Sequence, residues 1–219
     1  MASSERDPRF DVPLYTISEA AMHLRMSDET LRRWVNRGDL IRSLTPETPK
    51  SARLPFIAMA EAQFYLQLRR DGLSMQSVTT GMAAARQLLG ARFLVRGALA
   101  HDGKDVLLNL PDRDAASEWL RARDRQGGLP GVIERGLTHI TWGPDDRPER
   151  VRLVAYEGAD VIVDPRFVFG QPMLAERGVR TEDILQMFLA GDSIEDVAEE
   201  FRVPAQVVES IVRTHALAA

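Results

Sequence analysis

Residues 15–40, YTISEAAMHLRMSDETLRRWVNRGDL, constrain the fold of this chain more than any other segment. Thr16 and Glu19 have the spacing of a capping box, which predicts that a helix begins there over TISEAAMHL. Ser27 can cap a second helix, DETLRRWVNR, which we expect to end at Gly38. Because only a tight turn separates the two helices, the segment predicts a helix-turn-helix.

The second of these helices has one apolar stripe, and the stripe fixes which side chains face outward. Leu31, Trp34 and Val35 recur at helical spacing and must face the core. Arginine can bind guanine with two hydrogen bonds or clamp a phosphate, and asparagine can pair with adenine. The outward side chains are therefore candidates for DNA contact, although a solvated surface helix would have the same pattern. They are Arg32, Arg33, Asn36 and Arg37.

The next segment, DLIRSLTPETPKSARLPFI, contains three prolines and is typical of a strand, a loop and a strand. We interpret it as a wing whose Arg42, Lys50 and Arg53 contact phosphates. The distribution of charge supports this interpretation, because the formal net charge of −4 divides into +4 for residues 1–100 and −8 for residues 101–219. A positive front half favours a polyanionic partner for the predicted helix-turn-helix and wing.

The rest of the chain predicts an α+β fold. Two further helices are expected over residues 58–90, a β-hairpin around the Asp102-Gly103 turn, a helix over residues 113–126 and three strands within residues 137–164. Three C-terminal helices are expected to start at Thr181, Ser193 and Pro204. The expected parts are a tail (1–13), a winged helix-turn-helix (14–91), a small α+β middle domain with antiparallel hairpins (92–159) and a helix-turn-helix-like three-helix bundle (160–219).

Residues 14–90 resemble the winged helix-turn-helix domain of the MerR-like regulators, through YTISEAAMHLRMSDETLRRWVNRGDL and RLPFIAMAEAQFYLQLRRDGLSMQSV. The resemblance implies that Thr30 and Arg32 contact DNA and that the basic residues of the wing hold the phosphate backbone. This sequence departs from the family in having Arg25 where glycine is usual, a longer and proline-rich wing, and no cysteines for metal sensing. We expect Arg25 to adopt a left-handed backbone conformation at a cost of about 1 kcal/mol.

Residues 161–212 resemble the small C-terminal domain of VapB-type antitoxins of the uncharacterised-function class. Glu176 departs from that pattern, which has a glycine there. With its MerR-like front, the chain resembles the VapB45-like antitoxins, which are encoded beside a PIN-type toxin ribonuclease. The resemblance implies an antitoxin of a type II toxin-antitoxin module that neutralises this toxin and binds operator DNA to autoregulate transcription. The matching residues are Asp164-Pro165, Phe169-Gly170-Gln171-Pro172, Val179-Arg180-Thr181 and Ala190-Gly191-Asp192-Ser193.

The charge of the C-terminal bundle argues against a second DNA-binding domain. Residues 181–201 contain seven acidic side chains and no lysine or arginine, so the bundle should repel DNA. The same charge disfavours direct insertion of the bundle into a carboxylate-rich nuclease site. We therefore expect the preceding loop to contact the toxin through Phe169, Arg177 and Arg180.

Catalytic and membrane functions have no support in the sequence. The chain has no cysteine, four scattered histidines and no nucleophile or phosphate-loop motif, so we expect no metal, no cofactor and no enzymatic activity. It has no apolar leader and no run long enough to cross a membrane, which indicates a cytoplasmic protein with no membrane partner.

We expect a homodimer, because two copies can bind a palindromic operator. An apolar stripe, formed by Met75, Val78, Met82, Ala85 and Leu89, fits a dimer interface and core packing equally well. The hairpins of the middle domain could also pair between copies. Two other functions remain open at this point. The chain could be a MerR-like transcription regulator that senses a small molecule through its middle domain, or a scaffold that only dimerises.

Overall fold

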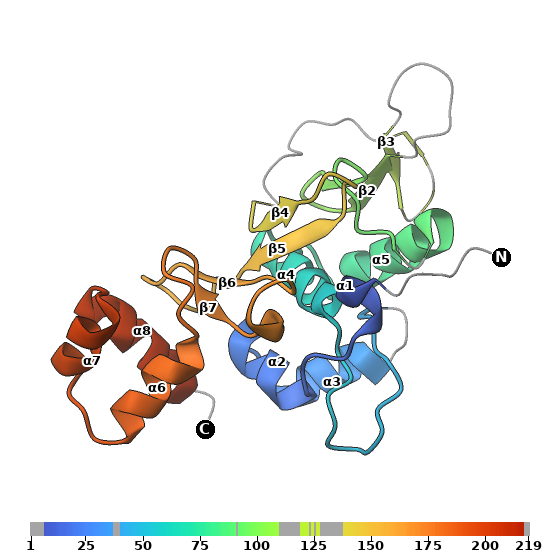
Figure 1. Cartoon of the computed structure of the whole chain (residues 1–219). Helices are drawn as coiled ribbons and strands as arrows, with labels where there is room; N and C mark the ends of the chain where they lie inside the picture. The colour runs from blue at the N-terminus through green and yellow to red at the C-terminus, as the bar shows by residue number, and fades with distance from the viewer. Residues whose placement is uncertain are drawn as a thin grey trace.

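The computed structural model describes residues 7–36, 40–90, 92–109, 119–122, 124, 126–127 and 138–216. Within these residues the chain is α+β, as predicted, with two small antiparallel sheets (Figure 1). The helices of the N-terminal half include both helices of the predicted helix-turn-helix. They are α1 (Pro8–Asp11), α2 (Ile17–Leu24), α3 (Asp28–Asn36), α4 (Phe56–Arg70) and α5 (Met75–Leu89).

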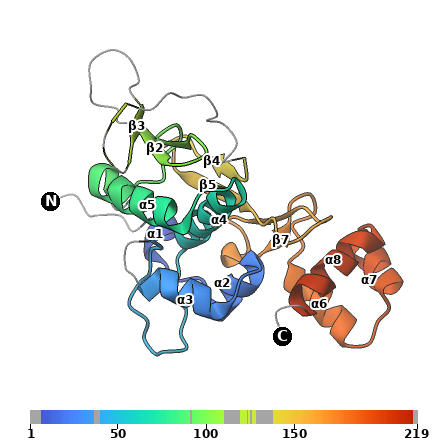
Figure 2. The same ribbon diagram turned by 180° about the vertical axis from the view of Figure 1, so that it is seen from behind.

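Helix α4 is the centre of the fold. Its side chains are buried on nearly every face, including those of Phe56, Met59 and Phe64, and it contacts α1, α2, α5 and strand β5 (Pro148–Arg152). Figures 1 and 2 show α4 between the helix-turn-helix and the strands. Burial of apolar side chains contributes about 25 cal/mol per Å², so the packing around α4 stabilises the N-terminal half.

The first sheet confirms the predicted hairpin but overturns a predicted helix. Strands β1 (Leu99–His101) and β2 (Val106–Asn109) pair across the turn, where Gly103 has a φ of 87°. Three residues of the helix expected over 113–126 instead form β3 (Trp119–Arg121), which pairs with β2, while residues 113–118 lie outside the described residues. The helical pattern was a local signal, and hydrogen bonds to a strand distant in sequence override it.

The second sheet joins the middle of the chain to its C-terminal part. Strand order is β4-β5-β6-β7, all antiparallel. The predicted boundary at residue 160 falls between β5 and β6, two neighbouring strands of this one sheet. The two-residue β7 was not predicted, because its only signal is its pairing with β6. The remaining strands are β4 (Ile140–Trp142), β6 (Val161–Val163) and β7 (Met173–Leu174).

The three predicted C-terminal helices are confirmed, and they form a separate bundle at one end of the molecule (Figure 1). Ser193 caps the second of them by accepting a hydrogen bond from the backbone N–H of Asp196 at 3.1 Å. The bundle is linked to the rest through β7 and through contacts between α2 and α8. Its helices are α6 (Thr181–Leu189), α7 (Ile194–Phe201) and α8 (Ala205–Ala216).

The apolar stripe on α5 belongs to the core. Val78, Met82 and Ala85 are completely buried, so core packing is the correct interpretation for the centre of this stripe. Gly81 lies among them, and a Cβ atom there would come within 2.5 Å of the Val106 side chain, so α5 packs directly on β2. No helix in the described parts of the chain is long and apolar enough to span a membrane.

Candidate functional site

The helix-turn-helix has the capping that the sequence predicts. The Thr16 side chain accepts a hydrogen bond from the backbone N–H of Glu19 at 3.2 Å, and the Glu19 carboxylate accepts one from the backbone N–H of Thr16 at 2.7 Å. Arg25 ends α2 in the left-handed conformation, with φ 53° and ψ 52°, as expected. The backbone N–H of Met26 then bonds to the carbonyl of Ala21 at 3.0 Å, which fixes the tight turn.

Burial orients α3 as its apolar stripe predicts. Leu31, Trp34 and Val35 are buried, and the Trp34 ring packs edge-on against Tyr65 with the ring centroids 5.7 Å apart. Its outer face therefore carries exposed side chains from Arg32, Arg33 and Asn36. Arg37 lies outside the described residues.

The start of α3 arranges two of the predicted DNA contacts. Ser27 caps the helix by accepting a hydrogen bond from the backbone N–H of Thr30 at 3.3 Å, and its hydroxyl donates to the Thr30 hydroxyl at 2.9 Å. The side chain of Arg33 is 63% exposed, with an Nη2 atom 4.0 Å from the Glu29 carboxylate. Such an exposed pair contributes at most about 1 kcal/mol, so Arg33 can exchange Glu29 for a stronger anion.

The wing is an irregular loop, and the two strands predicted within it are not formed. Leu44 donates a backbone hydrogen bond to Arg53 at 2.8 Å, which closes the loop, but Leu54 pairs with Tyr15 in an isolated bridge. Pro46 and Pro49 lack the backbone N–H that a hairpin ladder needs. The loop therefore projects beside α3 without forming a sheet (Figure 1).

The three basic residues of the wing have different surroundings. The guanidinium of Arg42 donates to the carbonyl of Phe10 at 2.9 Å and to the carboxylate of Asp11 at 3.0 Å, so its first role is structural. The Nε of Arg53 donates to the Ser43 hydroxyl at 3.1 Å. Lys50 is exposed at the end of the loop.

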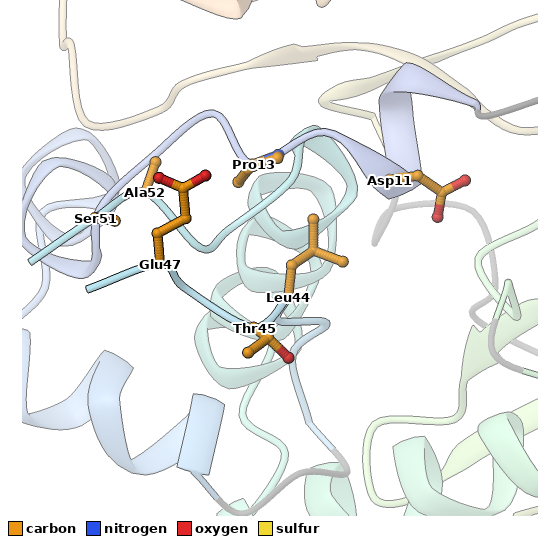
Figure 3. Close-up of a pocket in the computed structure, with 7 residues that line it drawn as sticks. All are labelled: Asp11, Pro13, Leu44, Thr45, Glu47, Ser51 and Ala52. Atoms are coloured by element: carbon orange, nitrogen blue, oxygen red, sulfur yellow. The ribbon is translucent and has the colours of Figure 1, made fainter. Parts of the chain in front are cut away.

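A cavity of about 940 Å³ separates the base of the wing from the segment after α1 (Figure 3). Its two carboxylates come from opposite sides, Asp11 from α1 and Glu47 from the wing. Asp11 is paired with Arg42 and Arg92, and among the described residues the cavity lining has no basic side chain that could hold a phosphate. The outer face of α3 and the basic side chains of the wing are therefore the better candidates for DNA contact. The lining residues are Asp11, Pro13, Leu44, Thr45, Glu47, Ser51 and Ala52.

A second candidate surface is the loop between β6 and β7, which displays Phe169. This side chain is 90% exposed, the highest value among the large exposed apolar residues in the described parts of the chain. Val168 and Phe169 have φ angles of 41° and 55°, a left-handed conformation that costs bulky residues roughly 1–2 kcal/mol each. Strain of this kind concentrates at functional positions, where the surrounding structure maintains it.

The loop is held at both ends by buried groups. The carboxylate of Asp164 is completely buried and accepts hydrogen bonds from the backbone N–H and from the Nε of Arg166, both at 3.0 Å. At the other end, the Tyr15 hydroxyl donates to the carbonyl of Gly170. Pro165, Gly170 and Pro172 are residue types typical of turns, but no local sequence pattern connects this loop with Tyr15.

The two arginines predicted to contact a toxin differ in availability. Arg180 donates to the Asp183 carboxylate at 2.9 Å and to the Gln171 side chain at 3.2 Å. Arg177 is exposed and, within the described residues, makes no hydrogen bond or ion pair. Because β6 and β7 are antiparallel, Arg177 and Phe169 lie beyond opposite ends of this pair of strands.

A buried cluster that the sequence did not reveal joins the helix-turn-helix to the bundle. The Nδ1 of His23 on α2 is 2.7 Å from the Tyr156 hydroxyl, which is 3.5 Å from the Nε2 of His215 on α8. Burial, with a smaller contribution from repulsion by His215, lowers the pKa of His23 from its ordinary value to about 3. Burial also lowers the pKa of His215. Both histidines of the cluster are therefore uncharged at neutral pH.

Two families of known proteins match parts of the chain. Residues 13–82 match a family described as "Putative DNA-binding HTH domain", which covers α2 to α4 and most of α5. Residues 161–213 match a family described as "Protein of unknown function (DUF433)", which begins at β6 and includes the Phe169 loop and the bundle. The two matches contain the two candidate surfaces.

One relative and one solved structure match almost the whole chain, and both come from Mycobacterium tuberculosis. The crystal structure of Rv2018 matches with a TM-score of 0.67 at 24% identity, covers 93% of this chain and 99% of that chain, and supports the fold. The protein named "Putative antitoxin VapB45" is 30% identical over 229 residues, which cover 94% of this chain and 96% of the relative. At this identity and coverage, the chain belongs to the VapB45 antitoxin family.

Proposed function

We propose that this protein is the antitoxin of a type II toxin-antitoxin module, that it binds and neutralises a PIN-type toxin ribonuclease, and that it binds operator DNA to autoregulate transcription. The observation that carries the proposal is the extent of the relationship to VapB45. It covers both the helix-turn-helix and the Phe169 loop, so both surfaces lie within the length that this chain shares with an antitoxin relative.

For DNA, we propose that α3 enters the major groove. Its buried stripe leaves Arg32, Arg33 and Asn36 directed outward, and these side chains can bind base edges and phosphates. Thr30 lies at the start of the same face, and we keep Arg37 in the proposed set because it follows directly. Lys50 and Arg53 of the wing would hold the phosphate backbone. A homodimer would place two such helices on a palindromic operator.

For the toxin, we propose two contact points, Phe169 in the β6–β7 loop and Arg177 in the segment between β7 and α6, with Arg180 of that segment contributing less. An exposed aromatic side chain and an unpaired arginine are the residue types that dominate protein interfaces. Arg180 is already paired with Asp183, so breaking that pair would offset part of any gain from binding. This contact would block the toxin by occlusion and needs no catalytic activity of the antitoxin.

Co-expression with the neighbouring gene tests the toxin half of the proposal. The expected result is a stable complex that loses ribonuclease activity, whereas two proteins that purify separately with full nuclease activity would contradict it. A mobility-shift titration over a series of salt concentrations tests the DNA half. Phosphate contacts make log affinity fall with log salt at about 0.9 per neutralised phosphate, and absence of binding at low salt would contradict the DNA half.

A further inference from the structure

We propose that Tyr15, a residue of the DNA-binding domain, is a positioning residue for toxin recognition, because it holds the strained loop that displays Phe169. The inference rests on the proposed function, in which Phe169 contacts the toxin. Tyr15 itself is buried, so it would not contact the toxin directly. Its role would be to fix the direction of a side chain that lies far from it in sequence.

The first evidence is the contact between the two segments. The Tyr15 hydroxyl donates a buried hydrogen bond to the carbonyl of Gly170, the residue that directly follows Phe169. Gly170 has a φ of 75°, and a Cβ atom there would lie 2.8 Å from Leu14 and 3.3 Å from the Tyr15 hydroxyl, so both the backbone conformation and the close contact favour glycine. The loop is therefore seated on the segment that enters α2.

The second line of evidence is the backbone conformation that the contact between Tyr15 and Gly170 maintains. Val168 and Phe169 are left-handed, and the turn closes with a hydrogen bond of 2.8 Å from the backbone N–H of Gly170 to the carbonyl of Phe167. Neither residue prefers this conformation. If the Gly170 carbonyl loses its donor, the loop can relax toward right-handed angles, and the Phe169 side chain then points elsewhere. Holding Phe169 in place before binding lowers the entropy lost on association.

The same residue also supports the base of the wing. The carbonyl of Tyr15 accepts backbone hydrogen bonds from Arg53 at 2.9 Å and from Leu54 at 3.0 Å. One buried tyrosine thus joins the base of the proposed DNA-binding wing, through its backbone, to the proposed toxin-binding loop, through its side chain. A change confined to the hydroxyl leaves the backbone bonds to the wing intact, so it separates the two roles.

The chemistry of the loop indicates the kind of pocket that it would enter. The guanidinium of Arg166 lies over the Phe167 ring, 5.6 Å from its centroid, next to the exposed Phe169. Because Arg166 is already paired with Asp164 and Glu149, the loop presents mainly the exposed rings of Phe167 and Phe169, and exposed rings fit an apolar pocket. We assign this pocket to the toxin.

A double-mutant cycle on toxin affinity tests the inference, using the full-length antitoxin and the toxin that co-purifies with it. Tyr15→Phe removes only the hydroxyl and should weaken toxin binding by about tenfold, mainly through a slower association rate. Phe169→Ala should weaken it by at least as much. The double variant should bind as weakly as Phe169→Ala alone, since Tyr15 acts only by directing Phe169. DNA affinity of Tyr15→Phe should equal that of the wild type.

The possible failures are distinguishable. If Phe169→Ala binds the toxin like the wild type, the toxin-contact assignment of the proposed function is wrong. If Phe169→Ala weakens binding and Tyr15→Phe does not, the assignment stands and the role of Tyr15 is wrong. If the two losses add, or if DNA affinity falls with toxin affinity, Tyr15 acts through general stability and the inference is overturned. Gly170→Ala, which displaces the loop from the other side of the contact, should reproduce Tyr15→Phe.

Discussion

Arg25 and Arg202 occupy equivalent positions in two helix-turn-helix motifs at opposite ends of the chain, and both have a left-handed backbone, with φ angles of 53° and 52°. In each motif the next residue donates a backbone hydrogen bond into the last turn of the preceding helix, at 3.0 Å from Met26 and 2.9 Å from Val203. The repeated geometry is accompanied by different charge, because α7 carries four acidic side chains where its counterpart α2 carries one, and α8 lacks the pair of arginines that α3 presents outward.

This equivalence predicts different effects of glycine at the two turns. Arg202→Gly should stabilise the protein by about 1 kcal/mol, because glycine adopts the left-handed conformation without the steric cost. Arg25→Gly should give a smaller gain, because it also removes the ion pair of Arg25 with Glu157 at 3.0 Å. Urea unfolding of both variants measures the difference, and a loss of stability in Arg202→Gly would contradict the prediction.

The orientation of α3 predicts separable effects of two arginines on DNA binding. Arg33→Ala should weaken operator binding by about 1–3 kcal/mol if Arg33 contacts a base, with little change in stability. The matched control is Arg42→Ala. It removes the bonds to Phe10 and Asp11, so it should lower the melting temperature and leave the salt dependence of DNA binding nearly unchanged. Mobility shifts over a salt series and thermal melts distinguish the two, and equal effects on DNA affinity would contradict the prediction.

The different surroundings of Arg177 and Arg180 predict which cation contacts the toxin. Arg177→Glu should weaken toxin binding at least tenfold without loss of stability, since it is exposed and would place a negative charge against an acidic partner. Arg180→Gln, as its counterpart, removes the pair with Asp183 and should change toxin binding less. Surface plasmon resonance with immobilised toxin measures both, and a larger loss with Arg180→Gln would reverse the assignment.

The His23 cluster predicts a loss of stability in acid. The folded state holds His23 neutral, with a pKa of about 3, whereas the unfolded chain takes up the proton below about pH 6.5. The free energy of unfolding should therefore fall as the pH drops below 6.5, by about 2 kcal/mol at pH 5. The groups that face His23 are the Tyr156 hydroxyl and His215. The negative charge of the nearby Glu182 favours the protonated forms of both groups and so opposes part of the lowering of the His215 pKa.

His23→Gln provides the control for this prediction, because glutamine can bond to the Tyr156 hydroxyl and does not titrate. Urea unfolding at pH 7.5 and pH 5.0 should show a loss for the wild type that exceeds the loss for His23→Gln by about 2 kcal/mol. Equal losses in the two proteins would show that other groups cause the acid sensitivity.

Comparison of sequence and structure shows that local signals were sufficient for the helix-turn-helix. The capping box at Thr16 and the cap at Ser27 act within a few residues, and the apolar stripe of α3 oriented its outer face correctly. Where pairing partners are distant, sequence was insufficient. Strand β3 was mistaken for a helix because its partner β2 decides its conformation, and the wing strands were not formed because Leu54 pairs with Tyr15.

For the candidate site residues, too, local patterns predicted what depends on neighbouring residues and missed what depends on distant ones. The exposure of Arg32, Arg33 and Asn36 could be read from helical spacing alone, whereas the engagement of Arg42 by Asp11 depends on a helix near the N-terminus that no local pattern connects to the wing. The contact of Tyr15 with the Phe169 loop joins residues that are even farther apart in sequence. Only the folded chain brings these residues together.

The pairing of β5 with β6 limits how antitoxins of this architecture can be recombined. A chimera cut at residue 160 would leave β5 with an unpaired edge and would transfer β6 without the strand that it needs. Unpaired edges of this kind promote aggregation between chains. A functional exchange of specificity between relatives should therefore transplant all four strands, β4 to β7, together with the bundle, so that no strand of this sheet loses its partner.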